Sequence, residues 1–429
     1  MNVSLRFEDL FALQQSIQWE FKNSPIEVTV ESIKRIILDS FNNAAATLKL
    51  QETQPFSESH IEIKILMRGL ENNPTLAYFD MSNLESESSR FSFKLYADVL
   101  FPFLKSGDLQ PLKSIWIHEI MHLTDYSELL KNLRLYKEKL REVSSSNFTF
   151  SYNEIRKDKH IILLQLIMQF RAEGIATLGE YAMGGAMDYL SPPRIAIKQF
   201  NQIISPLVSL IYSSDFDSRQ LSAYMEEINP YAYQIGAGVV LQGLRRKYAE
   251  IKGFEEIEKC MENNTPCILS TGESLIQLIH SFDSFDFIKY SFDQEWLYHN
   301  VIDLTSSYSN NLEIYEGFFV ILNKIKRTKD RRRFVVLLRN LLSTPFSLRD
   351  LREKHSEMNS NKLIPNEIKN NSTMLIKQLE HNPTDEVSLW AMTYVFSNRD
   401  LIDDSIEYFG YIDDFEVLST ALLLSKVPI

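Results

Sequence analysis

Cysteine, glycine and positive charge are all scarce in this 429-residue chain. The two cysteines, Cys260 and Cys267, have a spacing that fits neither a zinc ribbon nor a redox pair, and we expect reduced thiols in a cytoplasmic protein. Glycine occurs only 13 times, which favours helical structure. Acidic side chains outnumber basic ones by 57 to 45, so we expect no nucleic-acid binding, because such binding needs cations against the phosphates.

Long apolar runs are missing as well. No uninterrupted apolar stretch reaches the roughly 18 residues of a membrane-spanning helix, and the longest candidate, residues 161–170, contains Gln165 and Gln169. The N-terminus lacks the basic start and apolar stretch of a signal peptide. The sequence therefore predicts no stable membrane insertion and a cytoplasmic location.

The predicted fold class is mainly α with a small β-sheet, an α+β arrangement. Alternating apolar residues predict strands within a sheet that spans about residues 58–97, and helical periodicity dominates after Asp108. A chain of this length is expected to contain more than one domain. We predict four parts: a domain with the sheet and the following helices (1–290), a helical connector (291–350), a polar linker (351–374) and a helical module (375–429).

The segment SIWIHEIMHLTDY, residues 114–126, carries the clearest chemical motif. His118 and His122 are four positions apart, so on a helix both imidazoles lie on one face and can bind one ion. Glu119 is close enough to reach a water on that ion without binding the ion itself, which is the H-E-x-x-H pattern of zinc peptidases. The alternative is a core helix that carries the pattern by chance, but a buried His-Glu-His group among apolar neighbours needs a partner.

A catalytic zinc site needs a third protein ligand. Glu173, in the segment RAEGIATLGEY (171–181), interrupts an otherwise apolar helical stretch, where a lone carboxylate is costly to bury. The alternative is that Glu173 pairs with Arg171 on a solvated face. We predict that Glu173 completes a site for one Zn²⁺ with His118 and His122.

The two motifs, His118-Glu-Ile-Met-His122 and Glu173-Gly-Ile-Ala, together resemble those of gluzincin-type zinc metallopeptidases. The resemblance covers roughly residues 60–245. It implies a zincin catalytic domain within 1–290, a glutamate ligand on a later helix, and a small sheet whose edge strand holds an extended substrate. The chain departs from the thermolysin-like pattern in its long spacing and in having Thr177 where that pattern has an aspartate.

Four further residues are candidates for supporting roles. Asp125 follows His122 by three positions and could accept a hydrogen bond from a ligand histidine, or it could face solvent. Glu180 is a second candidate for this role, or an alternative ligand. The resemblance implies an oxyanion donor on a later helix, for which Tyr233 is the first choice and Tyr231 the second; a core tyrosine is the alternative for Tyr233.

The C-terminal module resembles a short YkvA-like domain of unknown function, with GYIDD (410–414) as the best-matching segment. This resemblance implies a helical hairpin and no activity, and it leaves room for a protein partner. The basic segment 324–340 is either a solvated helix face or a contact for an acidic lipid or partner.

The leading hypothesis is a zinc-dependent metallopeptidase acting on a peptide or protein substrate, with Glu119 as general base. One alternative is a catalytically silent interaction protein that keeps the zinc structurally. Another is a zinc hydrolase of non-peptide bonds. The presence of Glu119 favours an enzyme, because a structural site has no use for a base.

Overall fold

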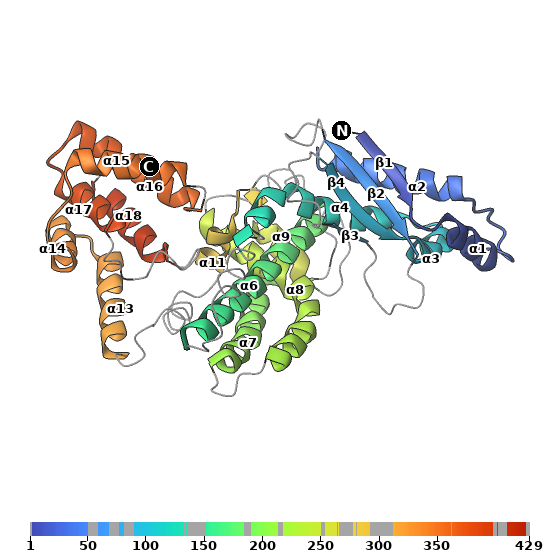
Figure 1. Cartoon of the computed structure of the whole chain (residues 1–429), viewed down its shortest axis with the longest axis horizontal. Helices are drawn as coiled ribbons and strands as arrows, with labels where there is room; N and C mark the ends of the chain where they lie inside the picture. The colour runs from blue at the N-terminus through green and yellow to red at the C-terminus, as the bar shows by residue number, and fades with distance from the viewer. Residues whose placement is uncertain are drawn as a thin grey trace. The chain divides into compact units, whose positions relative to one another are not determined.

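A computed structural model describes most of the chain (Figure 1). The described residues are 2–49, 59–67, 77–80, 90–132, 134–135, 152–183, 190–212, 218–249, 254–263, 265, 278–279, 281–291, 312–361, 363–397, 401 and 410–425. The chain forms two compact units. Unit 1 comprises residues 1–149 and 157–291, and unit 2 comprises 150–156 and 292–429, so the division lies beside the boundary predicted at residue 290.

The sheet of unit 1 has four described strands in the order β1-β2-β4-β3. They are β1 (Asn2–Phe7), β2 (His60–Leu66), β3 (Ala77–Phe79) and β4 (Arg90–Tyr96). The first three in this order are parallel, whereas β3 runs antiparallel to β4. The predicted sheet is therefore present, but β1 was not predicted, although its polar and apolar residues alternate; this strand is paired on one side only and remains partly exposed.

One face of this sheet is apolar and covered by helices. Ile61, Ile63 and Ile65 alternate into the core from β2, as the pattern predicts. The helices that follow the strands are α1 (Leu10–Glu20), α2 (Val30–Thr47), α3 (Phe101–Ser106) and α4 (Gln110–Thr124), with a 3₁₀ turn η4 (Ala97–Leu100) before α3.

Helices α2 and α4 meet over the sheet in an aromatic cluster. The rings of Phe41 and Phe93 both pack edge-on against Trp116 of α4, at centroid distances of 5.2 and 6.0 Å. The indole Nε1 of Trp116 donates a hydrogen bond to Ser40 Oγ at 3.0 Å, so its polar atom is satisfied inside the core. This packing anchors the helix that carries the histidine pair.

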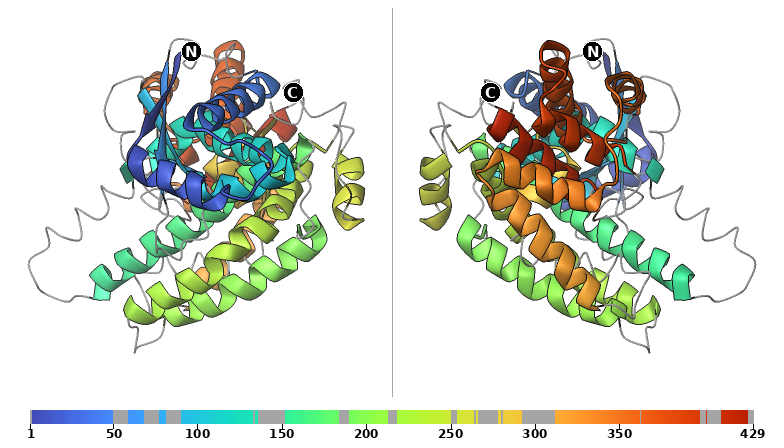
Figure 2. Two further views of the ribbon diagram at one scale, coloured as in Figure 1. Left: turned by 90° about the vertical axis from the view of Figure 1, so that its right-hand side faces the viewer. Right: turned by 90° about the vertical axis from the view of Figure 1, so that its left-hand side faces the viewer.

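The rest of unit 1 is helical. Its described helices are α6 (Tyr152–Ala182), α7 (Pro193–Tyr212), α8 (Ser218–Lys247), α9 (Phe254–Glu262) and α11 (Ser284–Ser291). The first residues of α6, up to Arg156, are grouped with unit 2. Helices α7 and α8 pack along their length, as the two light green helices of Figure 2 show. Helix α8 also packs against α11.

Glycine lets α6 and α8 approach closely. A Cβ atom added to Gly174 would lie 2.5 Å from the carbonyl carbon and oxygen of Gly236, so no side chain fits there without moving the backbone. The same glycine directly follows Glu173. Close packing at this point therefore sets where that carboxylate lies.

Gly174→Ala is expected to destabilise unit 1 by about 1–3 kcal/mol, because overpacking against backbone outweighs the better helix propensity of alanine. Chemical denaturation followed by circular dichroism measures the effect. Gly179→Ala is the matched comparison, because the three atoms nearest to its added Cβ all belong to the side chain of Met121 and not to backbone. Equal stability of the two variants would contradict the tight helix contact.

Unit 2 is entirely helical in its described part. Its helices are α13 (Leu312–Arg327), α14 (Arg331–Leu341), α15 (Leu348–Ser360), α16 (Asn366–His381), α17 (Glu386–Val395) and α18 (Ile412–Ser425). Helix α18 packs against α13, α16 and α17. Inside this group the Tyr394 hydroxyl donates to Asp413 Oδ2 at 2.7 Å, in the first turn of α18.

The predicted polar linker at 351–374 is wrong, because this segment belongs to helices α15 and α16. Ser347 and Asp350 form a capping box at the start of α15. Leu351 and Met358 lie on one face of this helix and are buried in the core. The abundant asparagine and serine side chains suggested a linker. The few apolar residues at helical spacing decide the structure, since they have neighbouring helices to bury against.

The predicted class, mainly α with a small sheet, is confirmed. Among the described residues, no helix combines the length and hydropathy needed to cross a bilayer. The YkvA-like resemblance of the C-terminal module stays a prediction, and its first matching segment, 398–406, lies outside the described residues except for Leu401.

Candidate metal centre

Helix α4 presents both predicted histidines on one face. His118 and His122 lie one turn apart, with ring centroids 5.0 Å from each other, and their side chains are only 9% and 13% exposed. The helix starts with a proline in its first turn, and Trp116 and Ile120 hold its opposite side in the core. Two imidazoles are thus directed to one point from a rigid element.

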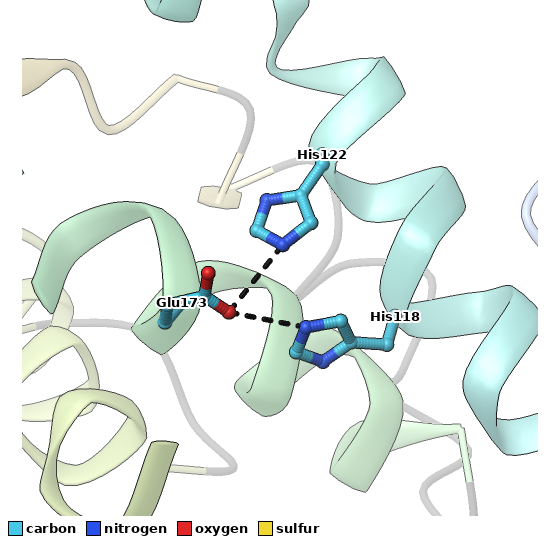
Figure 3. A group of neighbouring side chains, drawn as sticks. All are labelled: His118, His122 and Glu173. Atoms are coloured by element: carbon cyan, nitrogen blue, oxygen red, sulfur yellow. Dashed lines mark hydrogen bonds and ion pairs between the residues drawn. The ribbon is translucent and has the colours of Figure 1, made fainter. Parts of the chain in front are cut away.

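Glu173 of α6 points between the two imidazoles, as Figure 3 shows. Its Oε2 atom is 3.2 Å from His118 Nε2 and 3.5 Å from His122 Nε2. The three side chains are brought together as predicted, and their donor atoms lie within 4.8 Å of one another. Arg171 is paired elsewhere, so the alternative in which Glu173 pairs with Arg171 is not what the structure has.

These distances fit a tetrahedral zinc ion. With zinc–ligand bonds of about 2.0–2.1 Å, neighbouring ligand atoms of a tetrahedron are about 3.3 Å apart. The two contacts of Glu173 Oε2, at 3.2 and 3.5 Å, match that edge length closely. Among the described residues the donor set is two imidazoles and one carboxylate, which is the three-ligand set of a catalytic zinc site.

The charges of the cluster support each other. Burial would lower the pKa of His118, but hydrogen bonds to Glu173 and Glu180 outweigh it and raise this pKa to about 10. Burial would raise the pKa of Glu173, yet the two histidines hold it well below its usual range. The cluster therefore combines a carboxylate that stays ionised with a His118 imidazole drawn to positive charge, which a divalent cation would replace.

Glu180 occupies the supporting position that was predicted for either of two acids. Its Oε2 is 3.4 Å from Nδ1 of His118, on the side of the ring away from Glu173, and it is 6% exposed. A carboxylate at the distal ring nitrogen fixes the tautomer and orientation of a ligand histidine. Glu180 comes two helical turns after Glu173, and both therefore approach from α6.

Asp125 does not take this role, contrary to its prediction as a partner of a ligand histidine. Both of its carboxylate oxygens accept hydrogen bonds from Arg171, at 2.7 and 2.9 Å. The side chain is buried, so the solvent-facing alternative is also excluded. The physical reason is the nearby guanidinium, which a buried carboxylate prefers as a bidentate partner.

Glu119 lies beside the site and contacts the sheet. Its Oε2 accepts a hydrogen bond from the backbone N–H of Phe79 at 2.7 Å. Burial raises the pKa of Glu119, while the positive charges of His118 and His122 oppose the shift. Sequence reasoning missed the contribution of Phe79, because a backbone amide carries no residue signature.

The structure distinguishes between the two tyrosine candidates, Tyr233 and Tyr231. The ring of Tyr233 on α8 stacks on the imidazole of His118, with centroids 5.8 Å apart and planes 23° apart. Tyr231 is 43% exposed. Of the two, Tyr233 is the one in contact with the histidine pair.

Comparisons with protein-family models, with curated proteins and with solved structures give no match. The gluzincin resemblance thus rests on the two motifs, and the metal site rests on the chemistry and geometry of its own residues.

Zinc is expected to raise the melting temperature of unit 1, because it binds the folded donor set and not the unfolded chain. At zinc concentrations about 100-fold above Kd, the stabilisation is about 2.7 kcal/mol. Since the pKa of His118 is raised to about 10, the ion displaces a proton at neutral pH, so the shift becomes smaller as the pH falls. Thermal unfolding with zinc and with chelator, at pH 8 and at pH 6, measures this shift in melting temperature. A shift that grows towards pH 6 would contradict the assignment.

Proposed function

We propose that this protein is a zinc-dependent metallopeptidase. The observation that carries the proposal is the convergence of His118, His122 and Glu173 at tetrahedral spacing, with Glu119 beside them. Three ligands among the described residues favour catalysis over a purely structural role, since structural sites use four protein ligands.

In this proposal His118, His122 and Glu173 hold one Zn²⁺. When bound, the ion supplies a Lewis acid that polarises a carbonyl group and lowers the pKa of water to about 7. Glu180 keeps His118 oriented by accepting from its Nδ1 side.

Glu119 is the proposed general base. It takes a proton from the attacking water and passes it to the leaving amine. Its raised pKa, caused by burial, brings the carboxylate closer to the value that suits proton transfer near neutral pH. The N–H of Phe79 holds its Oε2 at a defined position.

Strand β3 is the proposed binding edge for the substrate. In the described sheet it is the last strand, and the N–H of Asp80 donates to Ser92 of β4. Because hydrogen bonds alternate in direction along an antiparallel strand, the N–H of Phe79 faces away from β4, towards Glu119. An extended peptide that adds to this edge would lie beside the base.

Tyr233 is the proposed donor to the oxygen of the scissile carbonyl. Its ring already lies against His118, and a phenol hydroxyl can stabilise the negative charge that develops there. Two proposals rest on the sequence alone: a cytoplasmic location, and a protein partner for the module at 375–429.

Zinc content, measured together with cleavage of a peptide library, tests the proposal. One zinc per chain and metal-dependent cleavage are expected. A chain that binds zinc but cleaves no peptide would favour the catalytically silent alternative, or a hydrolase of other bonds. A chain that binds no zinc would overturn the proposal altogether.

A further inference from the structure

A buried guanidinium joins three elements next to the metal-binding cluster. Arg171 is 2% exposed and sits on α6, two residues before Glu173. Its Nη1 and Nη2 donate to the two oxygens of Asp125, and Nη2 also donates to the backbone carbonyl of Phe282 at 2.8 Å. These contacts link the end of α4, helix α6 and the turn before α11.

The ion pair of Arg171 and Asp125 joins the same two helices, α4 and α6, that the ligand side chains join. Asp125 is the C-cap of α4 and follows His122 by three residues, while Arg171 precedes Glu173 by two. The same two helices are thus connected twice, once by the ligand cluster and once by the ion pair. The two helices also pack directly, with Met121 of α4 against Gly179 of α6, and the ion pair adds a contact of defined distance and angle to this packing.

The chemistry of this pair suits precise positioning. A guanidinium and a carboxylate that form two parallel hydrogen bonds fix distance and angle together, which a lysine cannot do. Metal ligands must lie within about 0.2 Å of their ideal distances, so small shifts between α4 and α6 matter. Neither Asp125 nor Arg171 contacts the ligand side chains through any described hydrogen bond, which separates their role from that of Glu180.

A second contact ties the same turn to the segment after α4. Glu128 Oε1 accepts from the backbone N–H of Ser284 at 3.0 Å. Burial alone would raise the pKa of Glu128, but the charges of Arg171 and Lys131 outweigh it and lower this pKa. The guanidinium therefore also helps to keep a second, partly buried carboxylate ionised at this junction.

We infer that Arg171 and Asp125 form a positioning pair that sets the spacing between Glu173 and the two histidines. They thereby determine the affinity and the coordination geometry of the metal site. The inference rests on the proposed metal site and does not depend on which bond the protein hydrolyses.

The test replaces both members of the pair, as Asp125→Leu/Arg171→Met. A double replacement leaves no unpaired buried charge, so folding is retained more readily than after a single substitution. Zinc affinity is measured by competition with a chromophoric chelator, and the Co²⁺ derivative reports coordination geometry through its visible absorption. We expect zinc to bind about 10–100-fold more weakly, as for losses around other metal sites, with an altered Co²⁺ spectrum.

The matched control is Lys247→Met/Asp286→Leu. It removes another ion pair of unit 1, which is partly buried and joins α8 to α11 through Lys247 Nζ and Asp286 Oδ2, 2.5 Å apart. Wild-type zinc affinity and Co²⁺ spectrum are expected for this control. The zinc affinity of Arg171→Lys should lie between those of the wild type and of Asp125→Leu/Arg171→Met, because lysine keeps the positive charge but not the planar guanidinium with its paired N–H donors.

Wild-type affinity and an unchanged Co²⁺ spectrum in Asp125→Leu/Arg171→Met would overturn the positioning role alone. Equal losses in both double variants would also overturn it, since they would show a general effect of stability. Failure of the wild-type protein to bind zinc would overturn the metal site and the positioning pair together, whereas the two outcomes above overturn the positioning pair and leave the metal site intact.

Discussion

Glu119→Gln is expected to lower the rate of peptide cleavage by about 10²–10⁴-fold, the usual contribution of a general base, while zinc content stays at the wild-type value. Glutamine has nearly the same shape, and its amide oxygen can still accept the hydrogen bond from Phe79, so the local structure is retained. What is lost is the ability to take up a proton. Cleavage of a peptide library and metal analysis on the same preparation measure both quantities.

Glu62→Gln provides the control for this variant. It makes the same chemical change in unit 1, at a half-buried position on β2 whose carboxylate contacts only Lys64 among the described ion pairs. Its cleavage rate should equal that of wild type. Undiminished cleavage by Glu119→Gln would remove the base from the mechanism, and loss of zinc by this variant would mean that Glu119 itself supports the metal.

His122→Ala is expected to weaken zinc binding by at least about 10²-fold and to lower any metal-dependent cleavage with it. A zinc site in a small protein binds with about 10–16 kcal/mol shared among four ligands, so removing one costs about 3 kcal/mol or more, or at least about 10²-fold in affinity. The loss also frees Glu173, whose Oε2 would retain only its contact with His118. Metal analysis after gel filtration measures the stoichiometry.

His60→Ala is the appropriate comparison. His60 lies on β2 of the same unit, and its Nε2 contacts Ser4 Oγ at 3.0 Å, so this variant also loses an imidazole and one hydrogen bond. It should retain one zinc. If His122→Ala keeps its zinc as well, the ion is held by other residues, and the whole assignment of ligands is wrong.

Two acids near the site show where sequence reasoning stops. Asp125 and Glu180 were both candidates to support a ligand histidine, since both are at suitable helical spacing. In the structure Glu180 contacts His118, whereas Asp125 accepts hydrogen bonds from Arg171. Spacing along one helix could not decide between them, because the competing partner of Asp125 comes from a different helix.

The fold, too, could be predicted from local sequence patterns only in part. The sheet was predicted at β2 and β4, where apolar residues alternate. The same alternation is present in β1, but it was not recognised as a strand, and β1 is paired on one side only and remains partly exposed. The segment at 351–374 was mistaken for a linker because composition outweighed spacing. Its helices depend on burial of Leu351, Met358 and Ile368 against neighbours that a local pattern does not reveal.

The sequence by itself determined the mainly helical class, the histidine pair on one helix face and the glutamate beside it, because these follow from periodicity within single segments. Only the tertiary structure decided that Glu173 meets those histidines, that Phe79 holds Glu119 and that Arg171 joins α4 to α6. Each of these contacts connects residues at least 40 positions apart, and such distances are set by how whole helices and strands pack, not by local sequence.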